Sequence, residues 1–258
     1  MTKFLQHLTA NTGLALLVAL ALASLAGCQS GPDPKPPQYQ CGTLSDNHCY
    51  ARVVFGQDDC SDTDPTKPPR VHGYETHIYV AEGISGGDGF ITHELWLASL
   101  ENKGWLEVGY AVESDGKPYY FWAENTADDV YATHKIAFVP PEDFGQYAVC
   151  RIVNVGENTF RITLANKSGT VLDTQVHNEM WRTKGYGWAT IGQELSGSRS
   201  ASAVTVQFAN NGRFDRTGTF NLETLNAVPI VSSPPYGDWV AKPSAGAGGT
   251  FATRCCLP

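Results

Sequence analysis

Two glutamates lie in strand-like segments whose other residues are mostly aromatic, aliphatic or very small. Glu107 lies in WLEVGYAV (residues 105–112) and Glu194 in YGWATIGQEL (residues 186–195). Two carboxyl groups that share one site cannot both ionise cheaply, so one keeps its proton while the other can accept one. Such a pair can act as general acid and general base on a bound water molecule. A glutamate on a strand is more often only a solubilising residue, and from these residues alone both interpretations stay open.

The alternation of side chains along a strand decides what surrounds each glutamate. Residues two apart point to the same side, so each glutamate shares its face with one tryptophan and one glycine. A glycine leaves room for another group to approach. We therefore expect both glutamates to face a groove or the solvent. The neighbours are Trp105 and Gly109 beside Glu107, and Trp188 and Gly192 beside Glu194.

The elements that position these residues are predicted to be strands. Apolar residues recur at every second position in several segments, and no period of 3.6 is sustained. The chain holds 26 Gly and 15 Pro, and turn signals such as NNG (residues 210–212) separate the strands. We predict an all-β fold, an antiparallel two-sheet β-sandwich of about a dozen strands in one domain over residues 41–258. The alternation is clearest at Leu106, Val108, Tyr110 and Val112, at Phe160, Ile162 and Leu164, and at Val204, Val206 and Phe208.

The N-terminus is predicted to be an export signal. Lys3 is followed by an apolar run over residues 14–25 that is too short for a comfortable membrane-spanning helix. The sequence LAGC (residues 25–28) resembles the bacterial lipobox, so we expect residues 1–28 to be a lipoprotein signal peptide with Cys28 as the acylated residue. A small-residue cleavage site with a chance cysteine is the alternative. Residues 29–40 contain four prolines and are expected to be an extended linker. The domain would then be tethered to a membrane of the bacterial cell envelope through its lipid alone.

Six cysteines remain once Cys28 is set aside, an even number in an exported chain. This is the requirement for three disulfides, with a Cys-rich lead at the start of the domain. We expect one bridge within residues 41–60 and at least one between Cys150 and the C-terminal pair. The six are Cys41, Cys49, Cys60, Cys150, Cys255 and Cys256.

Charge and composition exclude other classes of partner. The net charge is −8, which disfavours nucleic acid and anionic lipid. No C-x-x-C occurs and the histidines lack ligand spacing, so we expect neither a metal nor a cofactor. The default for each histidine is a surface or hydrogen-bonded position. The histidines considered are His72, His77, His93, His134 and His177.

Two of these segments resemble those of a known enzyme family. LEVGYAV (residues 106–112), followed by YYFW (residues 119–122), resembles the segment around the first catalytic residue of glutamic peptidases, both of the neprosin type and of the fungal scytalidoglutamic (eqolisin) type. GQEL (residues 192–195) resembles the strand with their second catalytic glutamate. The resemblance spans about residues 90–197. Glu rather than Gln at position 107 agrees with the neprosin type, and residues 41–89 contain no recognisable activation peptide.

The resemblance implies a concanavalin A-like sandwich of seven strands per sheet, whose concave face holds Glu107 and Glu194 as a catalytic pair. It implies an endopeptidase that hydrolyses peptides or proteins at acidic pH. Glu194 would be the ionised base and Glu107 the protonated acid, with the reverse assignment open. Candidate substrate-binding residues are Trp105, Trp122, Trp188 and Glu94. The alternation of side chains along the strand places Tyr110 in the core and does not decide the face of Trp122.

A different class of function uses the same aromatic residues. A tethered, non-catalytic β-sandwich could bind a glycan or a peptide on its aromatic face. Only the enzyme needs both carboxyl groups. A purely structural envelope protein needs neither the carboxyl groups nor an aromatic strip.

Overall fold

The fold is known from a computed structural model of the chain. It describes residues 48–55, 72–87, 89–99, 104–126, 128–179, 187–196, 205–215, 217–223, 230–233, 239–243 and 250–255. All of them belong to one compact unit, Pro37–Pro258. The predicted signal peptide, Cys28 and the linker at residues 29–40 lie outside the described residues. Within the described residues, no helix has the length and apolar character needed to cross a bilayer.

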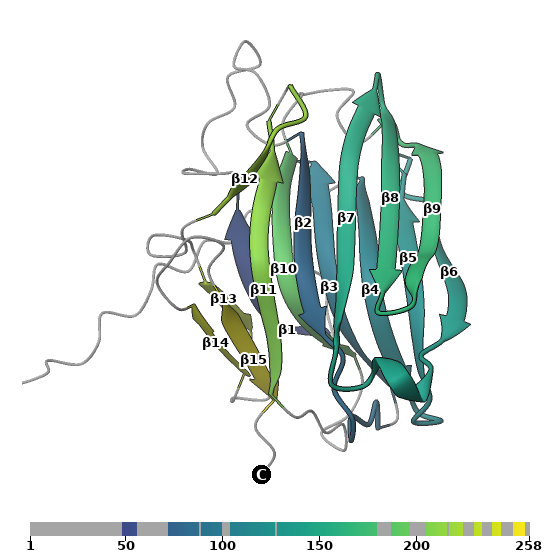
Figure 1. Cartoon of the computed structure of the whole chain (residues 1–258), viewed down its shortest axis with the longest axis vertical. Helices are drawn as coiled ribbons and strands as arrows, with labels where there is room; N and C mark the ends of the chain where they lie inside the picture. Colours follow the sequence, from purple (N-terminus) through teal and green to yellow (C-terminus); the bar gives the residue numbers. More distant parts are fainter. Residues whose placement is uncertain are drawn as a thin grey trace, which may run out of the picture. The chain divides into compact units, whose positions relative to one another are not determined.

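Fifteen strands in the described part of the chain form two antiparallel sheets (Figure 1). The seven-stranded sheet has the order β13 (Ile230–Ser233), β1 (His48–Phe55), β10 (Gly187–Ser196), β3 (Phe90–Ser99), β4 (Trp105–Glu113), β5 (Pro118–Asn125) and β6 (Tyr131–Phe138). The eight-stranded sheet has the order β14 (Trp239–Pro243), β15 (Phe251–Cys255), β11 (Val206–Phe214), β2 (Gly73–Tyr79), β7 (Tyr147–Gly156), β8 (Thr159–Asn166) and β9 (Gly169–His177). β12 (Phe220–Leu222) pairs with β11, and a short 3₁₀ helix, Pro141–Asp143, precedes β7.

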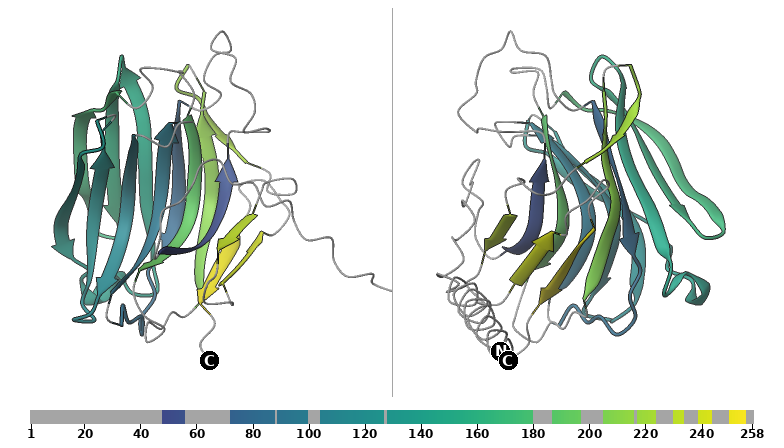
Figure 2. Two further views of the ribbon diagram at one scale, coloured as in Figure 1. Left: turned by 180° about the vertical axis from the view of Figure 1, so that it is seen from behind. Right: turned by 60° about the vertical axis from the view of Figure 1, so that its left-hand side comes forward.

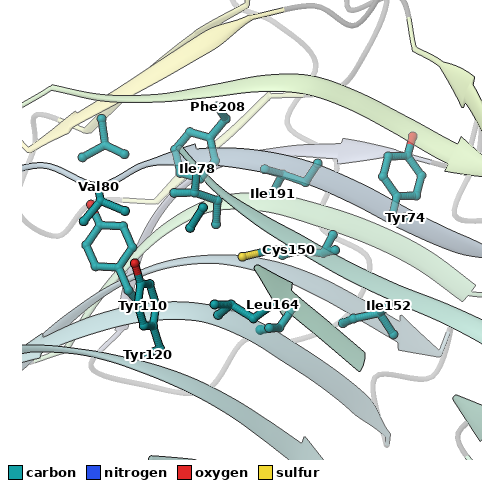
Figure 3. Close-up of a cluster of buried hydrophobic side chains, with 14 of the residues drawn as sticks. Tyr74, Ile78, Val80, Tyr110, Tyr120, Cys150, Ile152, Leu164, Ile191 and Phe208 are labelled. Atoms are coloured by element: carbon teal, nitrogen blue, oxygen red, sulfur yellow. The ribbon is translucent and has the colours of Figure 1, made fainter. Parts of the chain in front are cut away.

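The two sheets pack face to face, as the views of Figure 2 show. The apolar alternation in β4 behaves as predicted: Leu106, Val108, Tyr110 and Val112 are at most 1% exposed and join the core between the sheets. Phe160, Ile162 and Leu164 of β8 join the same core from the other sheet. Figure 3 labels Leu164 of this group together with Tyr110 of β4. The prediction of a two-sheet antiparallel β-sandwich is confirmed.

The predicted turn at residues 210–212 is wrong. These residues continue β11 through a β-bulge, where the pairing with β2 shifts between Ala209 and Gly212. Asn210 adopts the positive φ of 50° that this irregularity requires. The Thr76 hydroxyl donates to Asn211 Oδ1 over 2.7 Å. The turn-forming residues therefore serve a bulge instead of a chain reversal.

The predicted disulfide at Cys150 is also wrong. Cys150 is a free thiol on the inner face of β7, fully buried in the core (Figure 3). Burial raises the pKa of its thiol, so it stays protonated. The even count of six cysteines therefore no longer supports three bridges. Of the other five, Cys41, Cys60 and Cys256 lie outside the described residues, and the side chains of Cys49 and Cys255 are not described.

Candidate active site

The candidate site lies on the face of the seven-stranded sheet that points away from the core. On β4 the odd-numbered residues, including Glu107, have this orientation, because the even-numbered residues fill the core. Glu194 has the same orientation on β10, where Ile191 and Leu195 point into the core. We call this surface the site face. The predicted common face of the two glutamates is therefore present, with the strand β3 between them.

The register of the ladders places a third carboxyl group between these two. Glu194 lies opposite Thr92 on β3, and Glu107 lies opposite Trp96 on the same strand. Glu94 lies midway between those two positions and points to the same face. It is therefore the diagonal neighbour of both glutamates, at the roughly 7–8 Å typical of such positions in an antiparallel sheet.

Two glycines bring the strands around Glu94 close together. Gly192 and Gly109 lie directly opposite Glu94 on its two sides. A Cβ atom at Gly109 would lie 2.8 Å from the Cα of Glu94, and one at Gly192 would lie 2.6 Å from the Cα of Arg52. At these two positions of β10 and β4, therefore, no side chain separates Glu94 from the carboxyl group on either diagonal.

Burial and mutual charge dominate the electrostatics of the three carboxyl groups. Glu94 is 3% exposed, and Glu107 and Glu194 are each 5% exposed. Burial raises the pKa of Glu107 to about 8, and the charge of Glu194 adds to the rise. Burial, together with the charges of Glu107 and Glu194, raises the pKa of Glu94 well above its usual range. Burial therefore favours the protonated form of both Glu107 and Glu94.

Glu194 accepts a hydrogen bond from a tyrosine and lies near a buried arginine. The Tyr50 hydroxyl donates to its Oε1 over 3.3 Å. Arg52 lies on the same face of β1, opposite Gly192. Its guanidinium carbon is 4.3 Å from the centre of the Tyr50 ring and 5.4 Å from that of Trp96. Burial lowers the pKa of the Arg52 guanidinium, and the neighbouring Tyr50 and Glu194 oppose that lowering.

Several polar groups on the site face lack hydrogen-bond partners among the described side chains. The indole N–H groups of Trp96 and Trp105 lie beside the Glu107 carboxyl. They partly oppose the rise of its pKa that burial and Glu194 cause, although neither N–H meets the distance and angle of a hydrogen bond. Thr190 Oγ1 and Glu94 Oε2 are also buried without a partner. Buried polar atoms are normally paired, so this face is suited to a polar occupant.

The predicted substrate-binding residues have different outcomes. Trp105 lies on the site face beside Glu107, and its ring centre is 6.4 Å from that of Tyr131 on β6. Trp122 lies on the opposite face, against the core, and stacks on His134 at 3.9 Å, so it does not belong to the site. Trp188 lies opposite Ala98 at the start of β10, but its side chain is not described. Glu94 lies between Glu194 and Glu107, a position that the alternation of side chains along its own strand could not predict.

Sequence reasoning missed Tyr50, Arg52 and Trp96. The alternation of HCYARVVF (residues 48–55) carries a signal for the first two, since Tyr50 and Arg52 point to one side and Ala51 and Val53 to the other. The expectation for His93 is wrong. It is fully buried on the inner face of β3, neither ring nitrogen has a hydrogen-bond partner among the described residues, and it stacks on Tyr110 at 4.7 Å. Among the described residues, no group of three or more His, Cys, Asp or Glu side chains could hold a metal ion.

No family model and no curated protein matches the sequence. Solved structures of similar fold do exist. One is scytalidoglutamic peptidase with a transition state analog inhibitor, with a TM-score of 0.54 and 14% identity, covering 83% of this chain and 100% of that chain. Another is SCP-B, an eqolisin peptidase in complex with the tripeptide Ala-Ile-His, with a TM-score of 0.51 and 14% identity, covering 83% and 100%. The β-sandwich of this chain is therefore similar in fold to those of glutamic peptidases.

Proposed function

We propose that the chain is an exported, lipid-anchored endopeptidase that hydrolyses peptide bonds at acidic pH. The observation that carries the proposal is the placement of Glu107 and Glu194 on one buried face, with the pKa of Glu107 raised to about 8. The fold shared with glutamic peptidases supports it. The anchor rests on the lipobox at residues 25–28, and a peptide or protein is the substrate class.

The two glutamates divide the work according to their surroundings. Glu194 is the base: it takes a proton from a water molecule, whose oxygen attacks the peptide carbonyl carbon. Glu107 keeps its proton and donates a hydrogen bond to the carbonyl oxygen as that oxygen becomes negative. The C–N bond then breaks, and the proton held by Glu194 passes to the leaving amine. The products are a carboxylic acid and an amine, and both glutamates return to their starting states.

The unpartnered donors of the site face fit the same step. The indole N–H groups of Trp96 and Trp105 lie beside Glu107, where the developing oxyanion would be. Fixed donors in a buried site stabilise such a charge without reorganising. Both tryptophans would therefore reinforce the hydrogen bond from Glu107.

Digestion of an unfolded protein between about pH 3 and 7 tests the proposal. Glu107→Gln and Glu194→Gln are each expected to lower kcat/KM about a hundredfold or more. Glu75→Gln is the matched control, because Glu75 is a similarly buried glutamate, 7% exposed, in the other sheet. Activity that survives both site substitutions would refute the mechanism. If the wild type cleaves nothing at any pH, a module that binds glycan or peptide becomes the better hypothesis.

A further inference from the structure

We propose that Glu94 is a positioning residue of this site: it keeps its proton and donates it in a hydrogen bond to Glu194, which holds Glu194 ionised and oriented toward the attacking water. The proposal rests on the proposed peptidase function. It adds a third carboxyl group, whose role is to set the charge state of Glu194.

The position of Glu94 in the sheet makes this contact possible. Gly192 and Gly109 flank it in the two ladders, so no side chain of β10 or β4 at these positions stands between Glu94 and Glu194 or Glu107. Glu194 lies on one diagonal and Glu107 on the other. Burial raises the pKa of Glu94 most, the charges of Glu107 and Glu194 add to the rise, and a hydrogen bond from the Glu94 carboxyl to Glu194 acts in the same direction.

Among the residues that the structure describes, the charges that face Glu94 balance only if it is neutral. Arg52 supplies one positive charge, and the ionised Glu194 supplies one negative charge. If Glu94 and Glu107 were ionised as well, this buried face would carry two uncompensated negative charges. In the described part of the chain, the ionisable groups that act on or face Glu94 are Glu107 on β4, Glu194 on β10, Tyr50 and Arg52 on β1, and Tyr131 on β6.

The second oxygen of Glu94 leads to the same conclusion. Glu94 Oε2 is buried without a hydrogen-bond partner among the described residues. An ionised carboxylate with such an oxygen is far more costly to bury than a neutral acid, in which this atom is an uncharged carbonyl oxygen. The neutral acid can still donate its single proton to Glu194.

The test compares the pH dependence of kcat for wild type, Glu94→Gln and Glu94→Leu in the full-length protein. The glutamine keeps a donor N–H, so the acidic limb of its profile is expected to stay in place. The leucine has no donor, so its acidic limb is expected to move up by about one pH unit. A shift of both variants to lower pH would overturn the proposal, because it would show that Glu94 is ionised. An unshifted limb in both variants would also overturn it.

Infrared difference spectroscopy gives a readout that needs neither cleavage nor the leucine variant. At about pH 6 the wild type is expected to show the carbonyl stretch of two protonated carboxyl groups, and Glu94→Gln is expected to lose one of them. Glu75→Gln is the control and should keep both. An unchanged band in Glu94→Gln overturns the proposal. If the band is lost but the wild type cleaves no substrate, the proton is on Glu94 and the peptidase function is what fails.

Discussion

Tyr50 on β1 lies directly opposite Glu194 on β10 and donates its hydroxyl hydrogen to Glu194 Oε1 over 3.3 Å. A hydrogen bond to a charged group is stronger than one between neutral groups. Tyr50→Phe removes the donor and keeps the ring beside Arg52. We expect the acidic limb of the kcat profile to move up by as much as about one pH unit, with a several-fold loss of kcat.

Tyr120→Phe is the matched control for this change. Tyr120 also donates to a carboxylate, Asp143 Oδ2 at 2.8 Å, but it lies on the core side of β5. It should lower the free energy of unfolding without moving the pH profile. An identical profile for Tyr50→Phe and wild type would show that Tyr50 does not act on the base.

The burial of Glu107 predicts a fall in stability on the alkaline side. Its pKa is about 8 in the folded protein and 4.5 in the ordinary state. The folded state therefore binds this proton more tightly, and the resulting stabilisation is complete below 4.5 and lost as the pH rises through about 8. The loss is up to about 1.4 kcal/mol per pH unit within that window. Chemical unfolding of wild type and Glu107→Gln at several pH values measures it, and parallel curves would contradict the prediction.

His93 predicts the opposite slope on the acidic side. Burial lowers the pKa of His93 to about 3, whereas its ordinary value is 6.5. The unfolded chain therefore takes up this proton first, and the stabilisation present above 6.5 is lost as the pH falls through about 3. His93→Phe keeps a ring against Tyr110 and cannot be protonated. We expect its free energy of unfolding to fall less between pH 7 and 4 than that of wild type; an equal fall would exclude His93 as the cause.

The close approach of strands at Gly109 predicts an effect on stability. A Cβ atom there would lie 2.0 Å from the His93 carbonyl oxygen, and backbone cannot give way as a side chain can. Gly109→Ala is expected to lower the free energy of unfolding by at least about 1–3 kcal/mol. Gly156→Ala is the control, because its Cβ would lie 3.8 Å from that of Thr159, an ordinary contact. Equal stability of the two variants would contradict the register around Glu94.

The sequence contained enough information to predict the sheets and the face of each glutamate. Alternation in WLEVGYAV separates Glu107 from the core residues Val108 and Tyr110, and this follows from backbone geometry alone. The same rule could have placed Cys150 in the core, since it alternates with Ala148 and Ile152. Counting cysteines as pairs concealed that signal.

What the sequence could not supply is the register between strands that are distant in the chain. Glu94 becomes central only because β3 pairs with β10 on one side and β4 on the other, and a slip of one residue would turn it away. The prediction for Trp122 was wrong for a different reason. The segment YYFWA (residues 119–123) is apolar on both sides of the strand, so the alternation of side chains could not assign the face of Trp122.

Tyr131 predicts a change in substrate binding without a change in chemistry. It is 57% exposed on the edge strand β6, and its ring centre lies 6.4 Å from that of Trp105, next to Glu107. A peptide held over Glu107 would extend across these two rings. Tyr131→Ala is expected to raise KM about two- to tenfold while kcat stays the same, because the loss of one aromatic contact weakens binding alone.

Phe138→Ala provides the comparison on the same strand. Phe138 is 66% exposed but lies opposite Tyr119, at the other end of the β5–β6 ladder from Tyr131. Its removal should leave both KM and kcat unchanged, since it is remote from Glu107 along the strand. A lower kcat at constant KM in Tyr131→Ala would place this side chain in the chemical step. An equal rise of KM in both variants would mean that the substrate follows the whole exposed edge of β6 and not the path from Trp105 to Tyr131.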